Sequence, residues 1–206
     1  MAPMMAYNVI QPPFSLKFRQ MPQDELHGYL KRFLEIIPDR IKELADAVKE
    51  SSGFEDWEPD FTPDSLRPLG VWFAAQVQIR RKTRHERQEI ESHLAFPIQV
   101  EEWQLTDQTL SIAFDIGMYF SQILLQNYSS LRWEHLLNAT AITDGGKTSR
   151  FHADYGQPVL AGFGTVRLNP IRIATTLACG LARKSQSGER LYELYQYWSG
   201  LAMAKP

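Results

Sequence analysis

The run TDQTLSIAFDIGMYFSQILLQNY at residues 106–128 constrains the fold more than any other stretch of this chain. Its apolar residues fall on two faces of a helix, and a helix that is apolar on nearly all sides is buried on nearly all sides. Thr106 has the side chain of an N-cap, and Asp107 suits the positive end of the helix dipole. We therefore predict a long central helix that other elements surround.

Asp115 is the chemical exception within this helix. A buried carboxylate has to be paired or protonated. One expectation places Asp115 at the rim or in a salt bridge, with an arginine chosen from Arg132, Arg167 and Arg172. The other expectation is a catalytic acid, and the sequence leaves this alternative open.

Two strands are predicted after the central helix, at 131–137 and 155–163, because both stretches contain aromatic and branched residues. Trp133 is expected to pack across this pair against Tyr155 or Phe163. Asn169 and Pro170 then mark the start of another helix, as N-cap and first helical residue, and a last helix follows Gly188. The fold class is α+β: a mostly helical single domain with a small antiparallel sheet.

The first half of the chain reads as an arm followed by helices. Prolines at 3, 12 and 13 predict an extended N-terminal arm over residues 1–21, and the domain covers 22–206. Apolar spacing predicts a helix over 23–50, which we expect to break so that Pro38 begins a second helix. Another helix is predicted from Leu66 to Ile79, running into the basic residues beyond it, and 95–105 is expected to be a non-helical connector.

Composition narrows the class of protein. The 206 residues include 22 Lys and Arg against 24 Asp and Glu, a formal net charge of -2, and this balance argues against nucleic acid as a partner. A single cysteine, Cys179, excludes an internal disulfide framework and suits a reducing compartment. We expect neither a membrane span nor a secretory signal, and hence a soluble, cytoplasmic protein. The oligomeric state stays open.

The loop FEDWEPDFTPD at 54–64 combines carboxylates with aromatic rings and has no basic residue. One interpretation is that the aromatic side chains hold the loop on the body while the acids face water. The other is a surface for a basic partner, because aromatic side chains anchor interfaces and charge steers association. The candidate partner-binding residues are Glu55, Asp56, Trp57, Glu58, Asp60 and Phe61.

The basic run from Arg80 to Arg87 offers a phosphate-binding hypothesis. Glu86, Glu89 and Glu91 are interleaved with it, however, so pairing along a solvated helix is the simpler interpretation. The run is also a candidate to face the acidic loop within the molecule.

Other chemical motifs are absent or incomplete. The GGKT at 145–148 is not a phosphate loop, because Ala141 stands where the first glycine belongs and a strand-like run follows instead of a helix. The histidines are dispersed, which predicts no metal site, and no motif predicts a cofactor. A ligand pocket between the central helix and the sheet is the remaining enzyme-like hypothesis. Its candidate lining residues are Asp115, Trp133, His135, His152, Asp154 and Tyr155.

Four segments resemble a family of bacterial cytosolic proteins that has no established activity: IAFDIGMYFSQILL, LRWE, DYGQPVLAGFG and LNPIRI. The resemblance covers roughly residues 30–200. The layout is also similar to that of small immunity proteins found beside bacterial toxin systems. These resemblances imply no catalytic residue. With the missing catalytic motifs, they favour a non-enzymatic interaction or accessory protein, and a small-ligand-binding protein or enzyme is the alternative.

Overall fold

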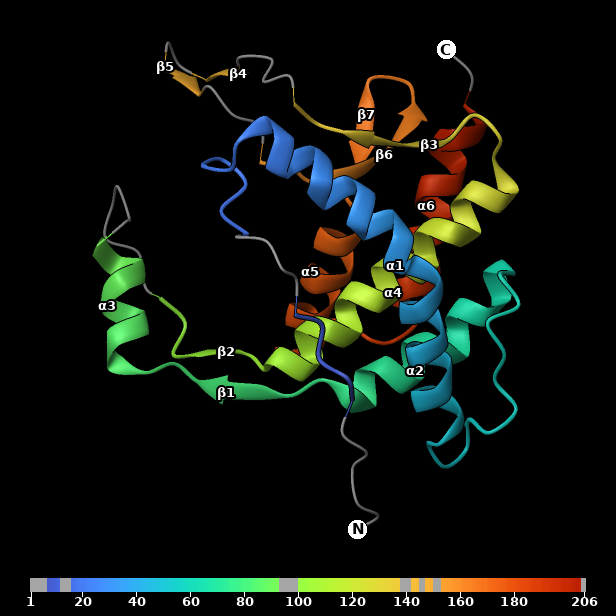
Figure 1. The fold of residues 1–206 in the computed structure, drawn as a ribbon. Helices are drawn as coiled ribbons and strands as arrows, with labels where there is room; N and C mark the ends of the chain where they lie inside the picture. The colour runs from blue at the N-terminus through green and yellow to red at the C-terminus, as the bar shows by residue number, and fades with distance from the viewer. Residues whose placement is uncertain are drawn as a thin grey trace.

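Helix α4 (Asp107–Asn127) runs through the centre of the molecule, and the other long helices pack around it (Figure 1). The computed structural model describes residues 7–11, 16–92, 100–137, 142–144, 147–149 and 153–204. Thr106 caps α4, because its hydroxyl accepts a hydrogen bond from the Thr109 N–H at 3.2 Å. The predicted central helix is therefore confirmed, including its cap.

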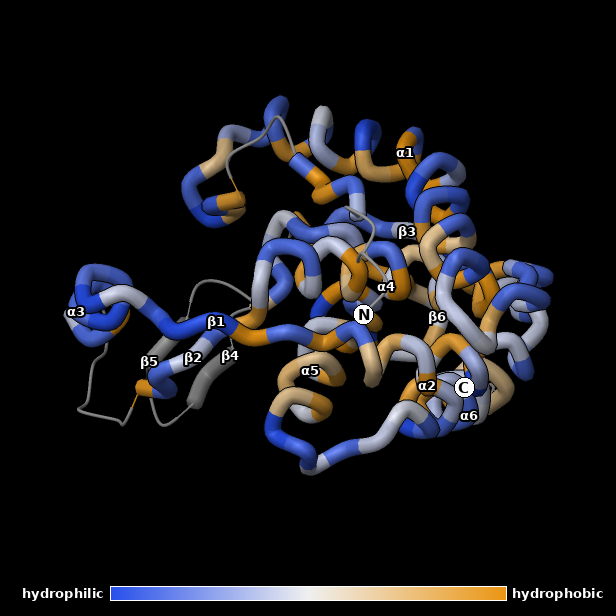
Figure 2. Tube along the Cα trace, turned by 90° about the horizontal axis from the view of Figure 1, so that it is seen from below, coloured by the Kyte–Doolittle hydropathy of each residue, from blue (hydrophilic) through white to orange (hydrophobic). Residues whose placement is uncertain are grey.

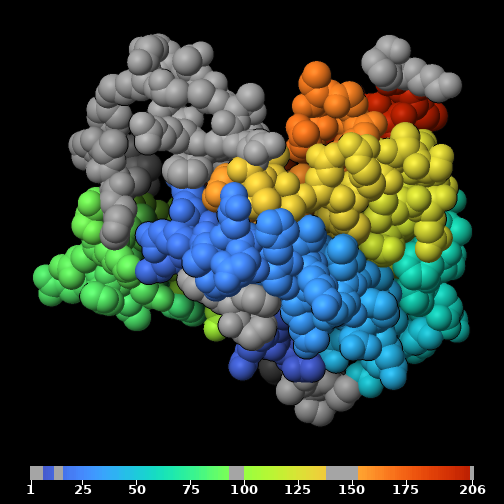
Figure 3. All heavy atoms as spheres, turned by 45° about the horizontal axis from the view of Figure 1, so that its top comes forward, coloured from blue at the N-terminus to red at the C-terminus, as the bar shows by residue number. Residues whose placement is uncertain are grey.

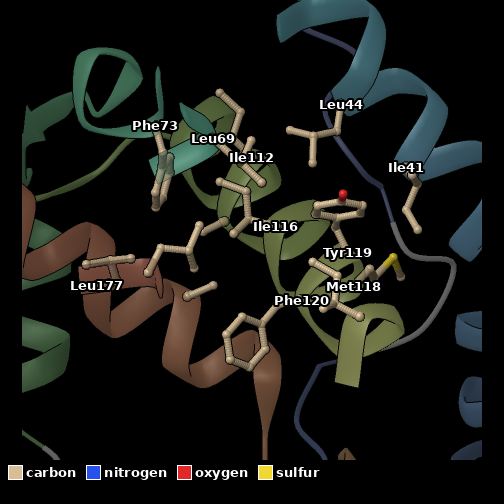
Figure 4. Close-up of a cluster of buried hydrophobic side chains, with 14 of the residues drawn as sticks. Ile41, Leu44, Leu69, Phe73, Ile112, Ile116, Met118, Tyr119, Phe120 and Leu177 are labelled. Carbon is tan, nitrogen blue, oxygen red and sulfur yellow. The ribbon is translucent and has the colours of Figure 1, made fainter. Parts of the chain in front are cut away.

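Four helices surround α4 and share one apolar core with it. Their bounds are α1 (Gln23–Lys49), α2 (Leu66–Gln76), α5 (Pro170–Ala182) and α6 (Arg190–Met203). Figure 4 shows Ile41 and Leu44 of α1, Leu69 and Phe73 of α2 and Leu177 of α5 converging on α4. A helix apolar on several sides is stabilised here because each side meets a different neighbour.

Helix α1 passes through Pro38 without ending, so the predicted break is wrong. A proline inside a helix removes one hydrogen bond and costs about 3 kcal/mol. Buried residues nevertheless continue on both sides of Pro38, from Phe33 and Ile37 to Ile41 and Leu44. Their packing against α4 outweighs the local cost, while Pro38 itself faces solvent.

A three-stranded antiparallel sheet covers one end of the helices, in the order β3-β6-β7. Its strands are β3 (Arg132–His135), β6 (Pro158–Phe163) and β7 (Val166–Leu168). The predicted strand pair is confirmed, whereas β7 was not predicted. Trp133 lies opposite Leu160 in the register, not opposite Tyr155 or Phe163 as expected.

Two shorter strands, β4 (Ile142–Asp144) and β5 (Lys147–Ser149), pair with each other in antiparallel orientation. The GGKT stretch therefore ends in a strand, as its rejection as a phosphate loop required.

The helix predicted to run from Leu66 through Ile79 into the basic run ends at Gln76 instead. Strand β1 (Ile79–Arg81) then pairs with β2 (Trp103–Leu105), and α3 (Arg84–Ser92) lies between them in sequence. We call residues 79–92 with 100–105 the β1–β2 extension. It projects from the body and is largely hydrophilic (Figures 1 and 2).

Two apolar side chains within the span of that predicted helix are exposed, Val71 at 51% and Ile79 at 49%. The chain leaves the helical path because Gln78 is held on both sides by Thr109: its N–H donates to the Thr109 hydroxyl, which donates to the Gln78 carbonyl. The predicted connector at 95–105 contributes β2, and its residues 95–99 lie outside the described part of the chain.

The described elements therefore form a mostly helical α+β fold with small antiparallel sheets. Within the described residues, no helix combines the length and the apolar character needed to cross a membrane.

Candidate functional site

A groove of about 1170 Å³ lies between α1, α4 and α5. We call residues 7–11 the strap. Its residues 8–11 form a further wall of the groove, and Pro158 of β6 contributes to the lining. Figure 3 shows the strap, in dark blue, beside α1. The groove brings together segments that are far apart in the sequence, so no local motif predicts it.

The lining of the groove is largely apolar. Phe33 and Ile36 come from α1, Leu110 and Phe114 from α4, and Ile171 from α5. Leu110, which the periodicity placed on a buried face, is 41% exposed, and Phe114 is half-buried. The central helix is therefore not covered on all sides, and its uncovered side faces this groove.

The rim of the groove carries more negative than positive charge. Asp39, Glu43 and Asp107 contribute carboxylates, whereas Arg32 contributes a guanidinium that makes no ion pair with the described residues. Arg40 also lines the groove, but its positive charge is neutralised by the ion pair with Asp115. A ligand that combines apolar groups with positive charge suits this surface.

Beside the groove, Asp115 forms a buried polar cluster with Arg40 and Tyr7. Arg40 binds the carboxylate with two nitrogens: Nε donates to Oδ1 at 2.8 Å and Nη2 donates to Oδ2 at 2.6 Å. The Tyr7 hydroxyl donates to the same Oδ2. Such a two-pronged pair satisfies a carboxylate both in charge and in geometry.

Burial raises the pKa of Asp115 from 3.8 to about 6, although the hydrogen bonds and charge of Arg40 oppose the shift. The pKa of Tyr7 is raised as well, first by burial and then by the Asp115 charge. At neutral pH the cluster therefore contains a carboxylate, a guanidinium and a neutral phenol.

The predicted arginine partners of Asp115 are all engaged elsewhere. Arg132 and Arg167 pair with Glu134, and Arg172 pairs with Asp154 at 2.8 Å. Asp115 pairs with Arg40 because α1, which carries Arg40, packs against α4 beside Asp115. The three predicted arginines lie on β3, β7 and α5. The salt-bridge expectation is thus confirmed in kind but wrong in partner.

The other residues predicted to line a ligand pocket do not lie together, and each contacts different residues. Trp133 packs edge-on against Phe33 with ring centroids 5.0 Å apart. His135 Nε2 lies 2.9 Å from the Gly156 carbonyl oxygen, and burial lowers the pKa of His135. His152 lies outside the described residues.

Asp154 serves the start of α5. Its Oδ1 accepts from Asn169 Nδ2 at 2.9 Å, and Asn169 in turn caps α5 by accepting from the Arg172 N–H. Tyr155, the last residue of the predicted set, is half-buried. None of the five described candidates lines the groove.

The loop at 54–64 turns its aromatic side chains toward the body. Trp57 is buried and packs edge-on against Tyr119, and its Nε1 donates to the Ser65 carbonyl at 3.1 Å. Phe61 has a left-handed φ of 58°, which is rare for a bulky residue, and its N–H donates to the Tyr119 hydroxyl at 3.1 Å. The aromatic part of the loop is thereby explained by packing.

The carboxylates of the same loop face solvent around a hollow of about 440 Å³. Glu58 pairs with Lys49 at 2.6 Å, Glu55 accepts from the Gly53 N–H, and Asp60 accepts from Thr62. Asp56 is exposed. The solvent-facing surface of the loop therefore carries negative charge, while Trp57 is buried.

Arginines of the basic run form ion pairs with nearby glutamates. Arg80 pairs with Glu86 at 2.6 Å, and this pairing holds the pKa of Glu86 well below its usual range. Arg81 lies near Glu102 at 3.5 Å. The run and the acidic loop lie at opposite ends of the molecule (Figure 1), so the two do not meet within one chain.

Sequence reasoning missed the groove, although one signal pointed toward it. The two apolar faces predicted for residues 106–128 offered more apolar surface than a small sheet and the adjoining helices had to cover. Leu110 and Phe114 are part of that surplus.

Among the described residues, no group of three or more His, Cys, Asp or Glu is arranged to hold a metal ion. Searches of family models, of curated proteins and of solved structures yield no match to this chain. The family resemblance therefore stays a prediction.

Proposed function

We propose that this chain is a non-enzymatic interaction protein that binds an apolar segment of a partner protein in the groove between α1, α4 and α5. The observation that carries the proposal is the uncovered apolar side of α4, with Leu110 and Phe114 facing an open groove of about 1170 Å³. A concave surface lined mainly by apolar side chains is typical of a binding site.

The size of the groove favours a chain segment over a small ligand. Small-molecule pockets usually measure roughly 300–1,000 Å³ and enclose most of the ligand. This groove is larger, and its walls come from helices and an extended segment. Helices and extended peptides commonly bind in such grooves through a few apolar anchors.

The charge of the rim indicates the flanks of that segment. Asp39, Glu43 and Asp107 make the rim negative, and Arg32 only partly offsets them. A partner segment with lysine or arginine beside its apolar anchors is favoured, because complementary charge raises the association rate and excludes acidic competitors.

A pair of neighbouring threonines on α5 tests the proposal. Thr175 lines the groove, whereas Thr176 is exposed and does not, and each hydroxyl donates to the carbonyl four residues before it. Thr175→Trp fills the groove, and Thr176→Trp is the matched control.

We expect a phage-displayed peptide library, panned on the wild-type protein, to enrich apolar peptides with basic flanks. By fluorescence anisotropy, Thr175→Trp weakens these peptides at least about tenfold, a change of roughly 1.4 kcal/mol, and Thr176→Trp leaves them unchanged. The proposal fails if no peptide is enriched, or if both variants bind as the wild type does.

We further propose that the carboxylates of the 54–64 loop steer such a basic partner. Charges at the edge of an interface act mainly on the association rate. Asp56→Lys is expected to slow association at low salt and leave the dissociation rate unchanged, as read by stopped-flow mixing with a selected peptide. Glu35→Lys, exposed on α1, is the control, and equal slowing by both would refute steering by the loop.

A further inference from the structure

The strap is held by side chains of two helices. The Tyr7 hydroxyl donates to the Asp115 carboxylate, and the Asn8 N–H donates to Glu43 Oε1 at 2.8 Å. The Ile10 N–H donates to Ser111 Oγ at 2.7 Å.

Arg40 completes the set, because its Nη1 donates to the Asn8 carbonyl at 2.9 Å. The strap is not part of any sheet. Its attachment therefore depends on four side chains that α1 and α4 present to a passing main chain.

Three of these four side chains make hydrogen bonds that any extended chain can satisfy. Glu43, Ser111 and the Arg40 Nη1 contact only main-chain atoms, so they make no demand on the side chains of the bound segment. Two contacts involve a side chain of the strap: Asp115 accepts from the Tyr7 hydroxyl, and the Arg40 guanidinium lies 5.7 Å from the centroid of the Tyr7 ring.

Val9 and Ile10 of the strap line the groove, so an apolar residue two or three positions after the tyrosine meets the apolar floor. The chemistry selected is a tyrosine followed by an apolar residue in an extended segment.

We infer that α1 and α4 form a recognition site for an extended, tyrosine-bearing peptide segment, and that residues 7–11 fill this site as a built-in competitor. The inference rests on the proposed function, since this site lies beside the groove that receives the partner and Val9 and Ile10 belong to both. It adds the identity of the anchor residue and a form of autoinhibition: a partner binds when its own tyrosine displaces Tyr7 from Asp115.

The strength of the competition between the strap and a free peptide follows from the effective concentration of the tethered strap. A tethered segment competes at an effective concentration of about millimolar, so a free segment of equal intrinsic affinity binds the occupied site poorly. The apparent dissociation constant rises in proportion as the open fraction of the site falls. Releasing the strap should therefore reveal binding that the intact chain hides.

The probe is a fluorescein-labelled synthetic peptide with the sequence of residues 6–11, AYNVIQ. In the full-length Tyr7→Ala variant the strap loses its side-chain anchor. We expect this variant to bind the probe at least about tenfold more tightly than the wild type, as measured by anisotropy. A second probe with phenylalanine in place of tyrosine should bind the variant more weakly than AYNVIQ does, because it lacks the hydroxyl that reaches Asp115.

Tyr197→Ala is the matched control, because Tyr197 is 63% exposed on α6 and its removal should leave probe binding at the wild-type level. Thermal unfolding establishes that each variant is folded. If Tyr7→Ala does not fold, Tyr7→Phe replaces it, since that variant keeps the ring and loses only the hydroxyl.

Two results would overturn the inference: a folded released-strap variant that does not bind the probe at millimolar concentration, or equal binding by wild type and variant. Failure here is distinguishable from failure of the proposed function. If library-selected peptides still bind and are blocked by Thr175→Trp, the groove is a binding site and the strap is a structural wall only. If AYNVIQ binds the released variant but no library peptide binds the groove, the strap site stands alone.

Discussion

Asp115 shows how one buried polar residue organises its surroundings. Its carboxylate collects hydrogen bonds from Arg40 and Tyr7, which come from α1 and from the strap. A buried ion pair is weak evidence for net stability, because the cost of removing both charges from water offsets most of their attraction. Removing one of the two partners is strongly destabilising, since the remaining charge is then buried without an opposite charge beside it.

Breaking the Arg40–Asp115 pair should cost more than replacing both of its members, and a double-mutant cycle tests this. Arg40→Leu and Asp115→Leu should each lower the free energy of unfolding by roughly 3–5 kcal/mol, and the double variant by clearly less than the sum. Urea denaturation measures all four proteins. Arg32→Leu, an exposed arginine on the same helix, should change the free energy by no more than about 0.5 kcal/mol. Additive single costs would mean that the two side chains are not coupled.

The pKa of Asp115 predicts a pH dependence of stability. Because the folded pKa, about 6, lies above the ordinary 3.8, the folded state holds more protons than the unfolded state between these values. Stability contributed by Asp115 therefore falls as pH rises through this window, by at most roughly 1.4 kcal/mol per pH unit. Arg40, Tyr7 and Glu43 are the charged or titratable groups that act on it.

The measurement compares urea unfolding of the wild type and Asp115→Asn at pH 4.5 and pH 7. The wild type should lose stability relative to the variant as pH rises, because only the wild type carries the Asp115 carboxyl group. The opposite sign would show that Arg40 lowers the pKa of Asp115 more than burial raises it.

At the scale of elements, the contact between α4 and α5 depends on one missing side chain. A Cβ added at Gly117 would lie 2.8 Å from Ile171 Cδ1 and 2.9 Å from the Pro170 carbonyl oxygen. The small residue lets the start of α5 lie directly on α4. The backbone of α5 cannot give way easily, because Asn169 and Asp154 fix its first turn.

Gly117→Ala should therefore lower the free energy of unfolding by roughly 1–3 kcal/mol despite the better helix propensity of alanine. Gly200→Ala is the matched control, because a Cβ there meets no atom within 4 Å and Gly200 also lies inside a helix. That variant should gain roughly 0.5–1 kcal/mol. Chemical denaturation measures both, and a stabilised Gly117→Ala would show that α5 can shift away from α4.

At the scale of the whole molecule, stability is unevenly distributed. The core around α4 is formed by several helices, whereas α3 has no buried residue and the β1–β2 extension projects from the body. Segments with few buried contacts open locally at low free energy, while core helices open only with global unfolding. The extension and the core should therefore behave as separate units of opening.

Hydrogen exchange followed by mass spectrometry tests this division. Peptides from 84–92 should exchange several orders of magnitude faster than peptides from 110–124, because their opening avoids the global free energy of unfolding. Comparable protection of both regions would contradict the division and indicate that the extension is covered in solution, for example by a second copy of the chain.

Local chemistry in the sequence was sufficient for many elements. Thr106 and Asn169 cap their helices because a side-chain oxygen can reach a free N–H within the first turn, and this depends on neighbours only. The strands β3 and β6 follow from branched and aromatic residues in the same way. Local rules failed at Pro38, where tertiary burial outweighed a local break. They also failed after Gln76, where the hydrogen bonds between Gln78 and Thr109 take the chain off the helical path.

The groove and the buried cluster could not be predicted from the sequence, because each depends on how separate helices cross. Arg40 lies 75 residues from Asp115 and Tyr7 lies 108 residues from it, so nothing in their spacing distinguishes them from the arginines that were expected. Sequence alone determined that residues 106–128 form a helix with apolar surface on several sides. The tertiary structure decided which part of that surface stays open, because coverage depends on where α1, α5 and the strap come to lie.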